Sequence, residues 1–244
     1  MKNSQIGHPI IHLESVDSTN NYAAKVFKSD QVPPGAVILS DIQTDGRGQR
    51  HKTWHSDAYL NLTFSITGAI NLWKINSLID LNRIVAIALQ RFFLKYDRSA
   101  KIKWPNDIMV RDQKICGILI ENFFRQGKPL SVIGIGINVN QKKFNAPRAT
   151  SIALLTESDH INKDILHTFL HSLDKTIKTF SSESSQSIRL SYDGLLWKKD
   201  DFHTFTLKEG RKVTGRIQST TSNGNLIVSM EGKNITFRNG EVSY

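Results

Sequence analysis

The sequence predicts an α+β protein with a mixed β-sheet and flanking helices, followed by a small all-β module. Short apolar strands alternate with two long amphipathic segments over most of the chain, which is typical of a sheet covered by helices. From His203 onward the pattern changes to short alternating runs separated by Glu-Gly and Asn-Gly pairs, which indicate hairpins. The length of 244 residues suits one large domain with a small appendage.

The first elements are predicted from apolar spacing and from capping residues. Ile10, Ile11 and Leu13 indicate a strand at 9–16, and the capping side chains of 15–20 precede a helix over 22–27. A turn follows at 33–35. Further strands are predicted at 36–39, 59–67, 101–104, 108–110, 115–121 and 132–138. Of these, 108–110 and 115–121 are expected to form a hairpin around 111–114.

The two long helices follow from a spacing of three to four residues between apolar positions. The segment 75–96 has apolar residues at 75, 78, 79, 85, 88, 89 and 92, and a second helix is predicted over 163–180. The serine-rich stretch 181–187 is interpreted as a solvated link before a short helix at 188–197.

The last segment resembles an SH3-like barrel in size and in the spacing of its turns. Its strands are predicted at 204–207, 213–219, 225–230 and 234–237. We therefore divide the chain into residues 1–198 and 199–244. Because about 45 residues barely support an independent core, the small module is expected to pack against the larger one.

Composition excludes several classes of protein. The chain is 39% hydrophobic and 22% charged, which argues against disorder and against fibrous folds. No apolar run approaches the roughly 20 residues of a membrane helix, and 1–9 lacks the apolar stretch of a signal peptide. The single cysteine, Cys116, favours a cytoplasmic location. The net charge of +10 points to a polyanionic partner without identifying it.

A glycine-rich basic loop is the first candidate for chemistry. It runs from Gly46 to Trp54, and its two glycines would expose backbone N–H groups while the interleaved cations suit a phosphate or a carboxylate. It lacks the Gly-Lys-Ser/Thr of a P-loop and the third glycine of a dinucleotide fingerprint. A surface turn with solvated charges is the alternative interpretation.

Two further segments combine apolar strands with polar or small residues. In a strand, Lys103 would face away from Ile102 and Trp104, toward a concave side, although an exposed edge strand with two solvated lysines is the favoured interpretation of this segment alone. Gly134 and Gly136 alternate within an apolar strand, which indicates that a ligand or another strand packs against the backbone, with tight internal packing as an equal alternative.

Other candidates are weaker. His167 and His171 have the spacing of some zinc ligands on a helix but lack a third ligand, so a solvated helix face is favoured. Cys116 lies in an apolar strand and is interpreted as a small core residue.

Taken together, these segments resemble the biotin protein ligases. The resemblance covers the chain from about Pro9 to Tyr244. It rests on six motifs that occur in the family's order: Asp17-Ser18-Thr19-Asn20, Gln43-Thr44 with Gly46-Arg47-Gly48-x-Arg50 and Trp54, Lys103-Trp104-Pro105-Asn106-Asp107, Gly117-Ile118-Leu119-Ile120-Glu121, Gly134-Ile135-Gly136-Ile137-Asn138 and Gly240-Glu241-Val242-Ser243.

The resemblance implies a catalytic domain like that of class II aminoacyl-tRNA synthetases and a two-step ligase reaction. Biotin and ATP, with Mg²⁺ carried by the phosphates, would give biotinyl-5′-adenylate, and the biotinyl group would then pass to a lysine of a biotin carboxyl carrier protein. Lys103 and Arg47 would be catalytic. The biotin contacts would be Ser18, Thr19, Asn20, Gln43, Gly46, Arg47, Gly48, Gln49, Lys103, Gly117, Gly134 and Gly136. The ATP contacts would be Arg50, Lys52, Trp54, Asn106 and Asn138, with no protein ligand to metal assigned.

The sequence departs from the family's pattern in three respects. Gln49 stands where arginine is frequent, and His51 stands where glycine is common. The resemblance begins by about Pro9, which leaves no room for the helix-turn-helix domain of the regulated ligases, so we expect a monofunctional enzyme without specific DNA binding. The family resemblance leaves room for a homodimer.

Two alternatives remain. One is a lipoate ligase or octanoyl transferase of the same fold, whose pocket motifs differ from those found here. The other is a basic nucleic-acid-binding module built on the C-terminal β segment, which would need interleaved aromatic and basic residues on that module.

Overall fold

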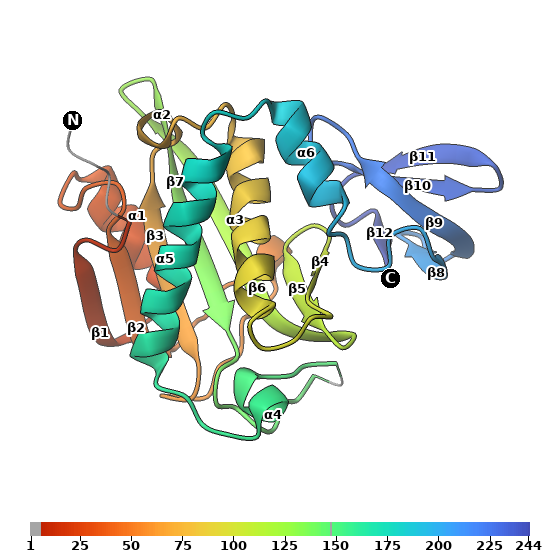
Figure 1. Ribbon diagram of the computed structural model, residues 1–244. Helices are drawn as coiled ribbons and strands as arrows, with labels where there is room; N and C mark the ends of the chain where they lie inside the picture. The colour runs from red at the N-terminus through yellow and green to blue at the C-terminus, as the bar shows by residue number, and fades with distance from the viewer. Residues whose placement is uncertain (1–5, 147) are drawn as a thin grey trace.

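A mixed sheet of seven strands forms the centre of the computed structural model, which describes residues 6–146 and 148–244 (Figure 1). The strand order is β1-β2-β3-β7-β6-β5-β4, and only the β1–β2 pair is parallel. The strands are β1 Ile10–Val16, β2 Val37–Gln43, β3 Leu62–Gly68, β4 Lys101–Lys103, β5 Asp107–Val110, β6 Gln113–Arg125 and β7 Lys128–Ile137. The predicted mixed sheet is confirmed.

Helices cover both faces of this sheet. The long helices α3 (Leu78–Phe93) and α5 (Asn162–Phe180) pack together on one face, as Figure 1 shows, and share a core with Val37 and Ile133. The helix α1 (Thr19–Lys28) covers the other face. Its core includes Ile38 and Val132, the strand neighbours of Val37 and Ile133. Neighbouring residues of one strand therefore point to opposite faces of the sheet and pack in two separate hydrophobic cores, as the two-residue period of a strand requires.

A second sheet of five antiparallel strands, in the order β11-β10-β9-β8-β12, follows the large one. Its strands are β8 Phe202–Leu207, β9 Lys212–Thr220, β10 Leu226–Met230, β11 Lys233–Phe237 and β12 Val242–Ser243. This sheet is consistent with the predicted SH3-like module, and glycines with positive φ occupy the predicted turns at 210, 224 and 232.

The small sheet has no core of its own. Phe205, Ile217 and Val228 belong to the same continuous cluster as Leu81 and Ile84 of α3. Polar contacts reinforce this junction. For example, the Arg83 side chain donates from Nη2 to the Thr221 carbonyl oxygen at 2.7 Å. The expectation that the β module packs on the larger body is thus confirmed.

Capping residues explain where the predicted helix bounds were wrong. The Ser77 hydroxyl accepts from the Asp80 amide at 3.1 Å, so α3 begins at Leu78 rather than at residue 75. The helix α6 (Ser185–Asp193) begins inside the segment predicted as a link, because the Ser184 hydroxyl accepts from the Ser187 amide at 3.1 Å. Two short helices, α2 (Ile70–Trp73) and α4 (Ile152–Thr156), were not predicted, since neither is long enough to show a period.

The β6–β7 hairpin is longer than its apolar pattern indicated. Both strands extend beyond the predicted bounds, and they pair from Cys116 opposite Ile137 out to Arg125 opposite Lys128. None of the helices in the described part of the chain is long and apolar enough to cross a bilayer.

Candidate active site

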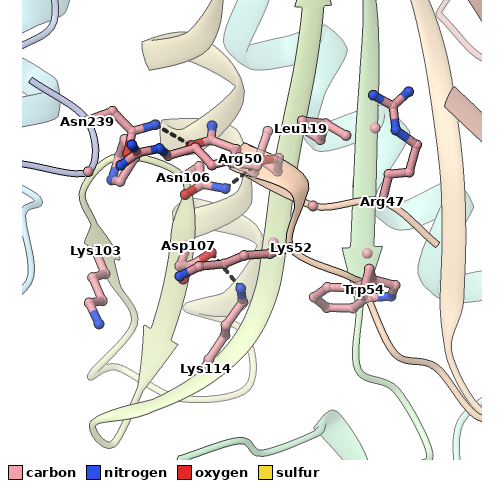
Figure 2. Close-up of a pocket in the computed structure, with 18 of the residues that line it drawn as sticks. Arg47, Arg50, Lys52, Trp54, Lys103, Asn106, Asp107, Lys114, Leu119 and Asn239 are labelled. Carbon is pink, nitrogen blue, oxygen red and sulfur yellow. Dashed lines mark hydrogen bonds and ion pairs between the residues drawn. The ribbon is translucent and has the colours of Figure 1, made fainter. Parts of the chain in front are cut away.

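A cavity of about 650 Å³ lies between the central sheet, the loop 44–54 and the small sheet (Figure 2). Its volume is within the usual range for a small-molecule site. All of the site residues predicted above line it except Gly46 and Asn138. The small sheet and the turn before β12 contribute Thr206, Leu207, Lys208, Asn239, Gly240, Val242, Ser243 and Tyr244.

One end of the cavity consists of buried, uncharged polar side chains. The first turn of α1 places Thr19 there, where its backbone N–H and its hydroxyl both donate to Gln43 Oε1, at 2.8 and 3.1 Å. Ser65 on β3 donates to Asn20 Oδ1 at 2.6 Å and lies 2.9 Å from Thr19 Oγ1. Ser18 occupies the N-cap position of α1, but its hydroxyl makes no capping bond. This network holds amide and hydroxyl groups in fixed positions away from bulk water.

Three glycines make room for the side chains of this wall. A Cβ atom built on Gly134 would lie 2.8 Å from Asn20 Cγ, and one on Gly136 would lie 2.5 Å from Trp54 Cζ2. Gly117, which pairs with Gly136 across β6 and β7, would place a Cβ 3.0 Å from Trp54 Cζ3. The alternating glycines therefore leave space for side chains of the protein itself, because Asn20 and Trp54 lie directly on the sheet.

The loop 44–54 is closed by its own backbone. Trp54 N–H donates to the Gly46 carbonyl at 2.8 Å, and Gly48 N–H donates to the Lys52 carbonyl at 2.7 Å. Gly46 does not line the cavity, because it serves this closure and a Cβ there would collide with the Trp54 carbonyl oxygen. The side chain of His51 lies outside the described residues.

Arg47 ties the loop to the sheet and to α1. Its guanidinium lies 3.1 Å from Glu121 Oε1 on β6 and donates to Asn21 Oδ1 at 2.7 Å. Glu121 also accepts from Asn20 Nδ2 at 2.9 Å, so one carboxylate connects the loop with the polar end of the cavity. Ser65 and Glu121 were not predicted as site residues. A polar residue between the apolar Phe64 and Ile66 was the available signal for Ser65.

Cations gather toward the other end of the cavity. Lys103 on β4 lines it while Ile102 and Trp104 are buried, which confirms the face expected from strand alternation. Figure 2 shows Lys103 apart from Lys114, which pairs with Asp107 at 2.7 Å. Burial lowers the pKa of Lys103, and the nearby Asp107 carboxylate acts in the opposite direction.

The small sheet holds the tip of the loop. Asn239 donates from Nδ2 to Gln49 Oε1 at 2.7 Å, the contact drawn beside Arg50 in Figure 2. The Arg50 guanidinium lies against Gly240, where a Cβ would be 2.7 Å from its Nη2 and closer still to the rest of the group. The half-buried Gln49 is therefore tied through its amide oxygen to the C-terminal module.

Two side chains that were predicted to contact ATP form hydrogen bonds within the protein. Asn106 faces the cavity, but its Nδ2 donates to the Ile118 carbonyl at 2.8 Å. Asn138 does not reach the cavity: β7 ends at Ile137, and the buried Asn138 side chain donates to the Thr150 carbonyl at 3.0 Å. Asn138 therefore lies outside the lining of this cavity, and its contact with the nucleotide stays a prediction.

The described residues form no cluster of three or more His, Cys, Asp or Glu side chains that could hold a metal ion. Burial raises the pKa of the Cys116 thiol, which agrees with a core residue rather than a nucleophile.

Comparison with known proteins finds one matching family and several similar relatives. The Biotin/lipoate A/B protein ligase family matches residues 12–140. The chain is 26% identical over 200 residues to the bifunctional ligase/repressor BirA of Bacillus spizizenii, covering 79% of this chain and 61% of that protein. It therefore spans about three fifths of that relative's length. It is also 24% identical over 214 residues to the biotin–[acetyl-CoA-carboxylase] ligase of Mycobacterium tuberculosis, covering 85% of this chain and 78% of the relative.

Among solved structures, the fold matches that of the biotin protein ligase from Aquifex aeolicus in complex with biotin and ATP. The TM-score is 0.78 at 24% identity, over 97% of this chain and 98% of the other. The match includes the second sheet, since it extends over nearly all of both chains.

Proposed function

The chain belongs to the biotin/lipoate A/B protein ligase family, and from this premise we propose that it joins biotin to a lysine of a carrier protein. In the first step a carboxylate oxygen of biotin attacks the α-phosphorus of ATP, which gives biotinyl-5′-adenylate and releases pyrophosphate. In the second step the lysine amine attacks the acyl carbon, AMP leaves, and the amine loses a proton. By family reasoning, the acceptor is a biotin carboxyl carrier protein.

The observation that carries the proposal is the division of one cavity into an uncharged polar end and a cationic end. Thr19, Asn20 and Gln43 line this end without charge, and Ser65 fixes Asn20 from behind, which suits the cyclic urea of biotin. At the other end, Lys103, Arg50 and Lys52 supply positive charge. A carboxylate and a triphosphate react there, and cations stabilise the charge that develops on the phosphoryl oxygens.

The loop residues are assigned in the same way. Arg47 and Lys103 are proposed to contact the reacting carboxylate and phosphate, and Gly48 presents its backbone to the biotinyl group. Part of the Trp54 indole rests on Gly136. We therefore propose that adenine contacts only the remaining part of this ring. Lys114 Nζ also lies 5.5 Å from the centroid of that ring, so it stands beside any base bound there.

The separate roles of the two parts of the chain are also a proposal. We assign the ligase chemistry to residues 1–198 and the SH3-like module to residues 199–244, which would complete the cavity wall. A cytoplasmic location is supported by the single cysteine, which is free and buried.

A lipoate or octanoate ligase is the rival within the family. A saturated chain or a dithiolane ring has no group that can hydrogen-bond to the polar end formed by Thr19, Asn20 and Gln43, whereas the urea of biotin can both donate and accept there. The polar network therefore favours biotin.

Pyrophosphate release tests the choice of substrate. The purified chain should release pyrophosphate from ATP with biotin and show at least a hundredfold lower rate with lipoate or octanoate. A faster rate with either of the latter would contradict the proposal. A filter-binding assay that detects salt-dependent nucleic-acid affinity, together with no pyrophosphate release, would favour the binding-module alternative.

A further inference from the structure

Two aromatic rings from outside the central sheet lie beside the Lys103 ammonium group. Lys103 Nζ is 5.3 Å from the ring centroid of Trp197, in the segment that follows α6, and 5.4 Å from that of Tyr244. These two rings stack with their centroids 5.7 Å apart and 23° between their planes. The ammonium group thus lies within the range of a cation–π interaction with both rings.

Both rings are held by the surrounding structure. Trp197 is buried, and its Nε1 donates to Asp112 Oδ1 at 2.6 Å. Tyr244 packs on Phe205, with ring centroids 5.3 Å apart, and lines the cavity beside Lys103. The rings therefore form a fixed surface against which a flexible side chain can rest.

The aromatic surface can stabilise Lys103, whose ammonium group is otherwise weakly held. Among the ion pairs of the described residues none involves Lys103, because the neighbouring Asp107 is paired with Lys114. A half-buried ammonium group without a carboxylate partner is poorly solvated, and a lysine side chain has many rotamers to lose when it is held in one place. Aromatic faces attract a cation without neutralising it, so the charge stays available to an anion in the cavity.

We infer that Tyr244, with Trp197, is a positioning residue for Lys103: the ring holds the ammonium group at the cavity wall before substrate binds. This inference rests on the proposed role of Lys103 in adenylate formation. Trp197 is the less suitable of the two for a test, because Lys198 Nζ also lies over its ring, 4.3 Å from the centroid. Tyr244 isolates the contact with Lys103.

Three variants of Tyr244 in the full chain distinguish positioning from simple packing. Tyr244→Phe keeps the ring and should retain near wild-type kcat for biotin-dependent ATP–pyrophosphate exchange. Tyr244→Leu removes the ring and should lower kcat about five- to tenfold, the range expected for a partly desolvated cation–π contact, with little change in biotin affinity. Pentafluorophenylalanine at position 244 keeps the shape but reverses the electrostatics of the ring face, and should lower kcat as Tyr244→Leu does.

A double-mutant cycle gives the decisive measurement. In a Lys103→Ala background, Tyr244→Leu should cause no further loss, because the group that it positions is gone. Phe202→Leu is the matched control, since it removes an exposed ring from the same sheet and should leave exchange unchanged. The inference is overturned if Tyr244→Leu matches wild type, if its loss persists without Lys103, or if the fluorinated ring behaves like phenylalanine. The last arm decides the matter even if Tyr244→Leu does not fold.

A second readout does not depend on enzyme activity. The pKa of Lys103, measured by NMR on labelled lysine, should be lower with the fluorinated ring than with phenylalanine, since only the latter favours the charged form. The charged neighbours are the same in both proteins: Lys52, Asp107, Lys114 and Arg148. An equal pKa would refute the contact. Absence of biotin-dependent exchange in the wild-type protein would instead refute the proposed function and leave this measurement interpretable.

Discussion

Replacing Gly136 by alanine should disturb the loop through Trp54. The new Cβ would lie 2.5 Å from Trp54 Cζ2, whereas carbon atoms in contact are ordinarily about 3.5–4.0 Å apart, so the indole must retreat by roughly 1 Å or more. Overpacking of this kind costs about 1–3 kcal/mol. If the ring instead leaves the sheet altogether, losing roughly 100 Å² of apolar contact costs about 2.5 kcal/mol, which is similar.

Thermal unfolding measures this effect. For a chain of this length we expect Tm to fall by roughly 2–12 °C. Gly117→Ala should have a smaller effect, because its Cβ would lie 3.0 Å from the same ring. Gly194→Ala is the matched control, since its new Cβ would meet only carbonyl oxygens at 3.6 Å and beyond. In a Trp54→Ala background, Gly136→Ala should cost little more. Equal Tm values for the Gly136→Ala and Gly194→Ala proteins, or full additivity with Trp54→Ala, would refute the reasoning.

Four further outcomes are expected. Lys103→Ala should reduce adenylate formation roughly 10²–10³-fold with Tm unchanged, because its side chain lines the cavity rather than the core, and near wild-type activity would contradict its role. Trp104→Ala should destabilise by about 3–5 kcal/mol in chemical denaturation, since it empties a core position and removes the Nε1 bond to the Gly224 carbonyl, and an unchanged midpoint would count against this. Amide exchange over 46–54 should slow when biotin and ATP are added, as an anion screens the loop's cations, and equal exchange in both states would refute this. Gln49→Arg should slow the release of biotinyl-adenylate roughly tenfold in a chase experiment, because it adds a charge at the cavity, and an unchanged or faster release would show that residue 49 serves only the bond to Asn239.

Local patterns predicted the secondary structure where a period or a turn residue was present. The alternation around Lys103 correctly placed Ile102 in the core and Lys103 on the cavity side, because a strand has only two faces. Helix starts at Leu78 and Ser185 were missed, since a single serine hydroxyl decides each of them. The same limit applies to α4, whose Ser151 hydroxyl accepts from the Leu154 amide, and α2 is too short to show an amphipathic period.

The candidate site was predicted less evenly. Motifs in the order of a known family brought most of the lining residues together, but the partners of these residues lie far away in the sequence. Gln49 was treated as a loop residue facing ligand or solvent, whereas its partner, Asn239, is 190 positions away. Glu121 was visible in a motif, yet its role in holding Arg47 depends on how β6 passes beside the loop. The bond from Asn138 to the Thr150 carbonyl was not predicted, because the direction of the chain after β7 is a tertiary property.

The residues that line the cavity are synthesised at different times. Asn20 and Asn239 lie 219 positions apart, so a ribosome adding about 5–20 residues per second needs roughly 10–45 s between them. During this interval the polar end can assemble while the wall formed by residues 239–244 has not been synthesised. A chain stalled or truncated before residue 239 would therefore have an open, unfinished cavity, and synthesis of residues 239–244 becomes a condition for activity. An intracellular assay of nested truncations should show activity only when residues 239–244 are present.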